Sequence, residues 1–552
     1  MEKRVVIFLV LSLAVIFGYD FLLKQLGLLP APDAVQEPPN ETRSASSGDA
    51  APPSSTPGGE ASRSPSTSSS QTSPPEQTRA SEQTVVIETD MVRVGLDARG
   101  GVISSWELKH HRTAAPESQP VQLVHQGAKF KGPLSISTSE AAADNALREG
   151  LYTIDTDVTS LDAAHPVGHA TLRFQDARSG LKVVKHLTFH QGSYLVDVAM
   201  TVEGLSGSYD VVLGTNFGIV EWGDGFIGLI GSASLVDGKV EKETPDTELE
   251  RKGTVEWVAL QDKYFLSVLM PKDANATFAK KEGEKLVSAG VRMPPPGEGP
   301  TRRLQLYAGP KEYDTLRSLN VGLEETIDFG WFIFGSWSVV KAVAKPIFYV
   351  LRFINEYTHN YGVTIILLTM GIKLLFVPLQ FKSYKSMKQM QMIQPKVLAL
   401  QQKFKDDRDK LNKELIKLYR DHRVNPVGGC LPMVLQMPVF VALFNILYMT
   451  IDLRQAPFIG WITDLSVQDP FYVLPIIMGA TMVIQQKITP TTMDPTQAKI
   501  MLVLPVFMTF LFVNFPAGLV LYWLTNNVLT IGQQVLTDRL YVNRPFIIEP
   551  SK

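Results

Sequence analysis

The chain has 552 residues, of which 45% are hydrophobic, and its formal net charge at pH 7 is −2. This length favours about three or four domains. The net charge identifies no partner by itself, because the basic residues are local. The single cysteine, Cys430, excludes an intrachain disulfide, and no Cys/His spacing suits a metal ion. We therefore expect no metal site and no cofactor.

The N-terminus has a short basic start, Lys3 and Arg4, followed by an apolar run from Val5 to Tyr19. No site of the small-x-small kind follows this run, so we expect an uncleaved transmembrane anchor over residues 1–28 rather than a cleaved signal peptide. The two basic residues keep the N-terminus in the cytoplasm by the positive-inside rule. The chain after the anchor is then exported.

The segment from Ala31 to Gln83 contains Val35 as its only large aliphatic residue and no aromatic residue. Such a composition cannot bury enough apolar surface to offset chain entropy. We expect a disordered tether, rich in Ser, Thr and Pro, over residues 29–83.

Short alternating runs begin at Thr84, among them "TVVIETDMVRVGLD" and "LKVVKHLTFHQGSYLVDVAMTV". Period-two alternation with turns that contain glycine predicts a large antiparallel sandwich over residues 84–325, with Asp237-Gly238 as the clearest hairpin turn. We expect this domain to be extracytoplasmic. Its seven histidines lack the spacing of a nucleophile or a metal site, so we assign them ordinary structural roles.

After Gly330 the sequence mixes Trp, Phe and Val with Lys341, Lys345 and Arg352. This pattern predicts an interfacial amphipathic helix over residues 326–348, or alternatively the first turn of the next membrane span. We expect a transmembrane core over residues 349–540 and a tail over residues 541–552. The core has five apolar segments, at about 364–380, 431–450, 471–486, 500–514 and 519–534.

The charges between these segments predict their direction. Twelve Lys or Arg and five acids lie between Lys382 and Arg423, whereas Arg454 is the only cation from Ile451 to Asp469. The first loop is therefore expected in the cytoplasm, which gives six spans with both termini inside and the sandwich outside. The expected fold class is a multi-domain membrane protein with five core helices, an anchor helix and an exported all-β domain.

The basic loop over residues 382–423 is predicted to be a hairpin of two helices joined by "DDRD". One interpretation is a solvated basic hairpin that only satisfies the topology rule. The other is a landing surface for ribosome or nascent chain, since flexible methionines suit surfaces that accept many apolar sequences. The residues assigned to this contact are Met387, Met390, Met392, Lys396, Lys403 and Lys417.

Lys373 lies inside the apolar run "TIILLTMGIKLLFVPLQ", about 18 Å along a helix from Tyr361. It can be explained by snorkelling to the interface. Against this, Thr369, Lys373 and Gln380 share one helix face, and Tyr522, Asn526, Thr530 and Gln533 form a similar stripe. Polar residues in membranes usually face the bundle interior or water, so we expect an open, hydrated, positively charged groove. The predicted groove residues are Thr369, Lys373, Gln380, Gln436, Tyr522, Trp523, Asn526 and Thr530.

Several long stretches resemble the YidC family of bacterial membrane-protein insertases, related to those of mitochondria and chloroplasts. They are "QPKVLALQQKF", "VNPVGGCLPMVLQMPVFVALFNIL", "LRQAPFIGWITDLSVQDPFYVLPIIMG", "KITPTTMDPTQAKIM" and "FPAGLVLYW". The anchor, tether and sandwich fit the Gram-negative form, whose exported domain resembles a β-supersandwich. Where that family has a groove arginine, five residues before a proline, this chain has Lys373 before Pro378. Lysine keeps the charge and loses the planar fork of donors.

The resemblance implies an insertase and chaperone of the inner membrane, not an enzyme. Its implied partners are nascent membrane proteins, the ribosome, lipid and the Sec translocon (SecYEG and SecDF), with no specific nucleic acid. Two alternatives stay open. One is a secondary transporter with a charged midplane site, although no inverted repeat is visible. The other is a sugar-binding or carbohydrate-active exported domain, which would need paired carboxylates.

Overall fold

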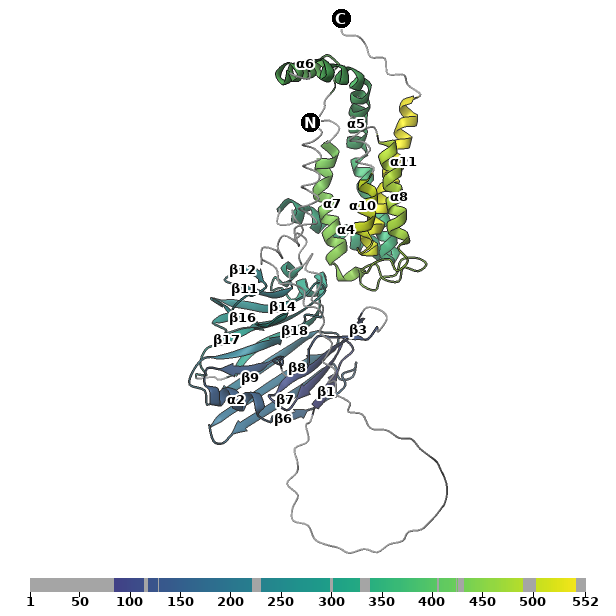
Figure 1. The fold of residues 1–552 in the computed structure, drawn as a ribbon. Coiled ribbons are helices and arrows are strands. Elements are labelled where there is room, and N and C mark those ends of the chain that lie inside the picture. Colours follow the sequence, from purple (N-terminus) through teal and green to yellow (C-terminus); the bar gives the residue numbers. More distant parts are fainter. Residues whose placement is uncertain are drawn as a thin grey trace, which may run out of the picture. The chain divides into compact units, whose positions relative to one another are not determined.

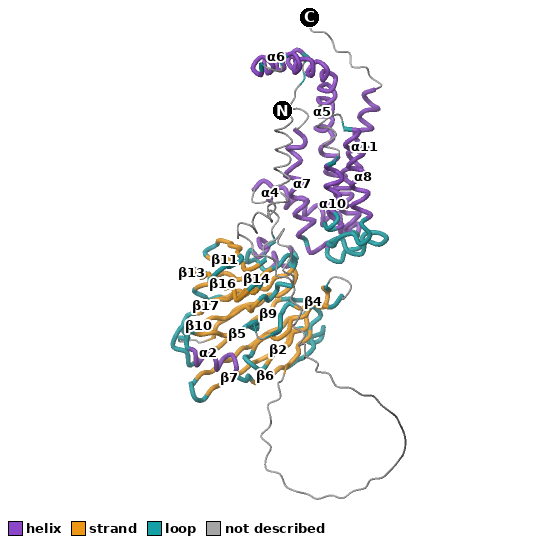
Figure 2. Tube along the Cα trace, viewed as in Figure 1, coloured by secondary structure: helices purple, strands orange, loops and turns teal. Residues whose placement is uncertain are grey.

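The computed structural model describes residues 84–113, 118–127, 129–220, 230–297, 301–327, 338–404, 407–422, 424, 431–489 and 503–542 (Figure 1). The strands belong to a first part that ends near residue 327, and the long helices belong to a second part that begins at residue 338 (Figure 2). The predicted anchor (1–28) and tether (29–83) lie outside the described residues, as do most of the tail and residues 328–337.

The first part contains three antiparallel sheets within the described residues, which confirms the predicted all-β domain. Their strand orders are β1-β2-β3-β4, β13-β16-β17-β10-β5 and β12-β11-β14-β15-β18-β9-β8-β7-β6. The strands are β1 Thr84–Glu88, β2 Val92–Asp97, β3 Val102–Arg112, β4 Pro120–Gln122, β5 Ser135–Thr138, β6 Thr153–Thr156, β7 Val167–Asp176, β8 Leu181–His190, β9 Leu195–Glu203, β10 Tyr209–Thr215, β11 Gly231–Val236, β12 Lys239–Glu243, β13 Leu249–Lys252, β14 Val255–Gln261, β15 Phe265–Pro271, β16 Ala276–Gly283, β17 Leu286–Met293 and β18 Thr301–Pro310. The short helices are α2 Ala141–Glu149, α3 Tyr313–Ser318 and the 3-10 turn η1 Leu323–Thr326.

The alternation of apolar and polar side chains along the strands explains why the sheets bury one face. In β8 every second residue is buried, from Leu181 to Phe189, while the residues between them are more exposed. Side chains of all three sheets meet in one hydrophobic core, where Trp106 and Trp257 are fully buried. Burying a large apolar side chain contributes about 1.5–3 kcal/mol, so this shared core is what holds the sheets together.

The turn between β11 and β12 has the geometry that the sequence predicts. Val236 pairs with Lys239, which leaves Asp237 and Gly238 as a two-residue loop. Their φ angles are 52° and 71°, both in the left-handed region. Two such residues make a type I′ turn, whose twist matches that of the flanking strands.

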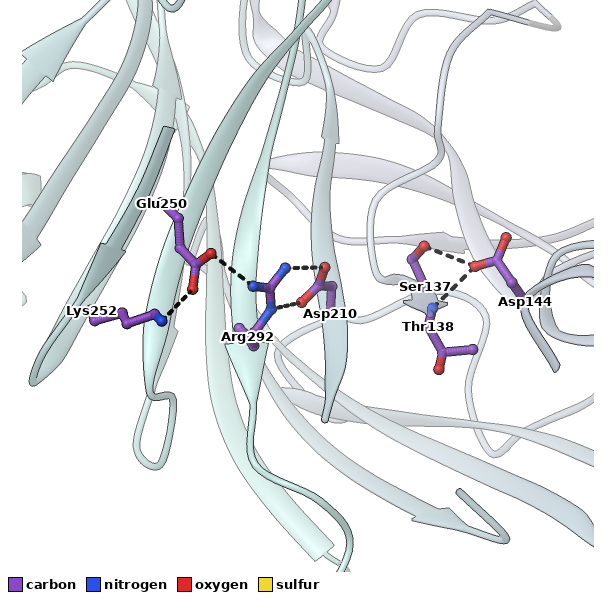
Figure 3. A network of polar contacts seen from close by, with 7 residues as sticks. All are labelled: Ser137, Thr138, Asp144, Asp210, Glu250, Lys252 and Arg292. Atoms are coloured by element: carbon purple, nitrogen blue, oxygen red, sulfur yellow. Dashed lines mark hydrogen bonds and ion pairs between the residues drawn. The ribbon is translucent and has the colours of Figure 1, made fainter. Parts of the chain in front are cut away.

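A polar row crosses the five-stranded sheet. Arg292 on β17 donates from Nε to Asp210 on β10 over 2.8 Å, and its Nη1 lies 3.0 Å from the carboxylate of Glu250 on β13. Figure 3 shows this guanidinium between the two acids. Its hydrogen bonds with Asp210 are the main reason that the pKa of Arg292 is raised. The arginine thereby joins three strands of the sheet.

One inward position of β8 carries a lysine instead of an apolar residue. The ammonium of Lys185 donates to the carbonyl oxygens of Gly101 and Leu134 at 2.7 and 2.9 Å, and lies 4.9 Å from the ring centre of Tyr152. Burial lowers the pKa of Lys185 to about 7. The carbonyl contacts stabilise the charged form and oppose that shift, but the effect of burial is larger.

The second part consists of helices, shown at the top of Figure 1. They are α4 Ser338–Thr358, α5 Tyr361–Lys403, α6 Arg408–Asp421, α7 Leu431–Met449, α8 Val473–Ile488, α10 Leu504–Phe512 and α11 Ala517–Val542, with the 3-10 turn η2 Ile451–Leu453. By length and composition, α5 is the one helix of the described residues that is long and apolar enough to cross a membrane. Shorter apolar helices are present at Leu435–Met449 and Val473–Ile488. The number of spans stays a prediction.

Two predicted boundaries differ from the structure. The hairpin was expected to begin at residue 382, but α5 continues from Tyr361 through that point to Lys403 as one helix of 43 residues. The interfacial helix was expected to end at residue 348, but α4 passes that point and ends at Thr358. In both cases the residues at the expected boundary are acceptable in a helix. The helix therefore continues although the amino-acid composition changes there.

Two glycines allow close packing in the helical part. A Cβ at Gly362 of α5 would collide with the ring of Phe458, and a Cβ at Gly479 of α8 would collide with Thr509 of α10. The helices share a core that includes Leu368, and this core orients the polar faces described next.

Candidate substrate site in the helical core

Lys373 faces the interior of the helical part. The helix that carries it begins at Asn360, whose side chain caps the first turn by accepting from the Val363 N–H over 3.1 Å. The lysine is 7% exposed, whereas Leu375 two residues later is 76% exposed. The same stretch of α5 therefore has an interior face with the cation and an exterior face of leucine.

The ammonium of Lys373 donates to Oγ1 of Thr530 on α11 over 2.8 Å. The Thr530 hydroxyl in turn donates to the carbonyl oxygen of Asn526, so its free lone pair is turned toward the lysine. The sequence placed these residues on facing polar stripes, and the structure brings Lys373 and Thr530 together.

The other predicted groove residues do not join this contact. In the described part of the chain, Lys373 shares a hydrogen bond with Thr530 and with none of the other predicted groove residues. The Thr369 hydroxyl donates to the Ile365 carbonyl of its own helix over 2.6 Å. Asn526, Gln380 on α5 and Gln436 on α7 are half-buried.

Two of the predicted groove residues belong to an aromatic cluster. Tyr522 is buried and lies 6.2 Å, between ring centres, from Phe440 on α7. Trp523 contacts Phe440 and Phe512 at 5.1 and 4.8 Å between ring centres. Their surroundings are those of packed core side chains.

A second polar face of α11 was missed by the sequence analysis. Asn527 donates to Thr481 of α8 over 3.3 Å, and Gln534 donates to Thr489 over 3.0 Å. Asn527 is buried, and hydrogen bonds between helices help to hold membrane bundles together. Asn527 and Gln534 are seven residues apart, which places them on one face of a helix, so this face could have been predicted from the sequence.

The two helices of the hairpin pack through a small apolar seam. Ile393 and Val397 of α5 are buried together with Val424, and Met390 packs against them. Lys396 Nζ lies 2.9 Å from Nε2 of His422, a contact that the sequence analysis did not anticipate.

The remaining hairpin residues are more accessible. Met392, Lys396, Lys403 and Lys417 are exposed, and Met387 is half-buried. Lys403 lies 5.4 Å from the ring centre of Phe404. These residues form a basic surface with an apolar seam beneath it, rather than one methionine patch.

An ion pair also links the middle of α5 to the C-terminal part of α11. Lys388 Nζ lies 3.0 Å from the carboxylate of Asp538, and both side chains are partly exposed. The ammonium is 5.7 Å from the ring centre of Tyr384, which is buried. The two helices are thus joined at Lys373 and again fifteen residues further along α5.

The β domain has an open cleft of about 570 Å³ on its nine-stranded sheet, lined by residues that include His186, Asp197 and Arg303. Burial acts to raise the pKa of Asp197, but hydrogen bonds from Gln305 and His190 outweigh it, so that pKa is lowered. Within the described residues, no group of three or more His, Cys, Asp or Glu is arranged to hold a metal ion.

These observations define a class: a protein with an antiparallel β domain and a helical part in which α5, which is long and apolar enough to cross a membrane, carries a buried lysine. Two family models match the chain, "60Kd inner membrane protein" over residues 353–544 and "YidC periplasmic domain" over residues 84–350. This chain is 38% identical to the membrane protein insertase YidC of Syntrophus aciditrophicus, over 99% of this chain and 100% of that protein. It is 36% identical to that of Geotalea daltonii, over 99% of each.

Among solved structures, an active YidC insertase crystal structure with the first transmembrane domain resolved matches with a TM-score of 0.34 and 17% identity. That match covers 82% of this chain and 92% of the other. From the full-length relatives, the chain belongs to the YidC family of membrane protein insertases. The family is one of inner-membrane proteins with a periplasmic domain.

Proposed function

We propose that this chain inserts newly made proteins into the inner membrane and helps them to fold, alone or with the Sec translocon, through a positively charged groove at Lys373. The observation that carries the proposal is Lys373, a residue only 7% exposed within the apolar N-terminal half of α5. A cation inside a membrane costs about 2.5–3.5 kcal/mol on insertion scales, so its presence needs a functional reason.

The contact with Thr530 suggests how a client is received. A hydroxyl satisfies one donor of the ammonium but carries no charge, whereas a carboxylate would add Coulombic attraction, which is stronger in the low-dielectric interior than in water. A carboxylate in the exported segment of a client can therefore replace Thr530 as the partner of Lys373. The enclosed lysine then has to become accessible, which requires α5 and α11 to separate locally.

The driving force for insertion is burial of the client's own apolar residues in lipid. The groove lowers the barrier for the polar segment by offering water and a positive charge along the route. No covalent bond is made or broken in this cycle. Because lysine lacks the planar fork of arginine, we expect it to attract carboxylates without bidentate geometry.

We further infer the arrangement in the membrane from the charges. The basic hairpin of α5 and α6 lies in the cytoplasm and contacts the ribosome or the nascent chain, and both termini are cytoplasmic. The β domain over residues 84–325 lies in the periplasm, separated by the tether from the anchor. Because the groove residues all follow Gly330, deleting residues 84–308 should leave insertion largely intact.

Site-specific crosslinking tests the proposal. A photoreactive residue is placed at position 373 or at position 375, and ribosome-bound nascent chains are presented. We expect position 373 to crosslink the polar exported segment of the client, and position 375, which faces outward, to crosslink its apolar segment. Failure of position 373 to reach any client, while the protein remains active, would remove Lys373 from the route. Solute flux through liposomes would instead favour the transporter alternative.

A further inference from the structure

The segment between α7 and α8, residues 450–472, has an outward apolar surface that its role as a connection does not explain. Trp461 and Phe471 contact each other with ring centres 6.3 Å apart, and Phe471 is 65% exposed. Ile459 of the same segment is 71% exposed. Large exposed apolar side chains that contact one another mark interaction surfaces more often than isolated ones do.

A buried carboxylate holds this surface in place. Asp469 is 1% exposed and accepts hydrogen bonds from the Trp461 indole N–H at 2.9 Å and from the Leu474 N–H at 2.7 Å. Its Oδ1 also accepts from the Phe471 N–H at 3.0 Å. The carboxylate thus ties the first turn of α8 to the indole, and the indole nitrogen needs no partner from outside.

The inner side of the segment is fixed to the helical part. Leu453, Ile462 and Leu465 are buried in the helical core. The Gly518 N–H donates to the Leu465 carbonyl over 2.9 Å, and the Ala517 N–H donates to the Val467 carbonyl over 2.7 Å. The segment is therefore packed and hydrogen-bonded against the helical part on its inner side, which distinguishes that side from the outer one.

The outer side continues into the exposed face of α8. Ile476 and Ile477, five and six residues after Phe471, are exposed, and so is Ile484 two helical turns after Ile477. In an inner-membrane protein an apolar helix face of this kind contacts lipid. The surface of Trp461 and Phe471 thus begins where the lipid-facing surface of α8 ends.

We propose that the outer side of residues 459–472 lies in the headgroup region of the bilayer and is covered by phospholipid. Trp and Tyr are enriched at this level because they combine an apolar ring with a polar group. The two acids of residues 459–472 accept hydrogen bonds from the protein itself: Asp469 from the groups named above, and Asp464 from the Ser466 hydroxyl at 2.7 Å. Neutral phospholipid therefore suffices, with no requirement for charged headgroups. The proposal rests on membership of the family and not on the proposed function of Lys373.

Depth-dependent quenching tests this directly in the full-length protein reconstituted into vesicles of phosphatidylcholine alone. Cys430→Ser removes the native thiol, and single cysteines at positions 471, 484 or 239 carry an environment-sensitive fluorophore. Position 484 is the control for lipid contact. Position 239 is an exposed lysine beside the turn between β11 and β12 and serves as the control for water.

We expect lipids with a quencher near the headgroup to quench the fluorophore at 471 more strongly than lipids with a deep quencher do. Position 484 should show the reverse order, and aqueous iodide should quench the fluorophore at position 239 most. Quenching of 471 by iodide and not by either lipid would overturn the proposal. So would protection of 471 from all three quenchers, because a protein partner would then cover it. Asp469→Asn should weaken the shallow quenching at 471 by releasing the segment.

Discussion

Substitutions of Lys373 separate a groove cation from a lysine that only reaches the interface. We expect Lys373→Arg to be tolerated, Lys373→Ala to weaken insertion of clients with acidic exported segments, and Lys373→Glu to be worst. The reason is that arginine keeps the positive charge, alanine removes it, and glutamate turns attraction into repulsion. The order of the variants matters more than the size of any one effect.

The magnitude follows from the contact in the structure. The hydroxyl of Thr530 is 2.8 Å from the ammonium of Lys373, so a carboxylate in its place would be a directly hydrogen-bonded partner. Hydrogen bonds to charged groups contribute about 1.5–3 kcal/mol net. Loss of about 2 kcal/mol corresponds to roughly thirtyfold weaker capture of a client with one acid, since about 1.4 kcal/mol is a factor of ten.

The assay is protease protection of clients inserted by liposomes that carry each variant. The clients differ only in the number of acids in the exported segment, with Asn and Gln as replacements. The defect of Lys373→Ala should grow with the number of client acids and vanish when they are replaced. Leu375→Ala is the matched control, because that side chain faces outward on the same helix.

A lysine that only snorkels gives a different result. Alanine would then remove the burial penalty and be neutral or better for folding, with no dependence on the client's charge. Equal insertion by Lys373→Ala and the parent across the client series, at equal protein level, would refute the groove.

Three further predictions concern the scaffold. Gly479→Ala should destabilise the helical part by about 1–3 kcal/mol, because the added methyl collides with Thr509, and Thr509→Ala in the same chain should restore part of the thermal stability. The pKa of Lys185 is lowered to about 7, so the folded state loses a proton before the unfolded state, and β-domain stability should rise from pH 7 to about 10. Hydrogen exchange, corrected for intrinsic rates, should lose this slope in Lys185→Met, and an unchanged slope would contradict the reasoning. Reversing either charge of the pair Lys388 and Asp538 should weaken the contact between α5 and α11 at this point by no more than about 1 kcal/mol, and exchanging both should restore the distance between spin labels there.

The β domain could be predicted well because its strands obey a local rule. The alternation of buried and exposed positions along residues 181–202 predicts β8 and β9. Asp237-Gly238 forms the turn of the hairpin of β11 and β12, as expected. The order of the strands could not be predicted, because β18 pairs with β9 across about a hundred residues. Such pairing is decided by the shared core, which a local pattern does not contain.

Helix boundaries were harder to predict because composition and backbone geometry need not change together. In α5 the sequence changes from apolar to basic near residue 381, which suggested that the hairpin starts there. Lys, Met and Gln are all good helix formers, so nothing in the segment requires the helix to stop. Pro378 and Pro395 lie within α5 without ending it, as Pro346 lies within α4.

The polar residues of α11 show what a sequence can and cannot say about a site of this kind. Spacing identifies Asn526, Asn527, Thr530 and Gln534 equally, because all are polar residues on an apolar helix. The structure separates them: Asn527 and Gln534 pair with neutral side chains of α8, whereas Thr530 pairs with the ammonium of Lys373. At the two amide-to-hydroxyl contacts the partners are neutral, so a carboxylate would gain no attraction between opposite charges there, whereas it would gain that attraction at the ammonium of Lys373. If the bundle opens for a client, a carboxylate of that client can therefore replace the contact that is lost between α11 and α5. It does not replace the contacts that would be lost between α11 and α8 in the same way.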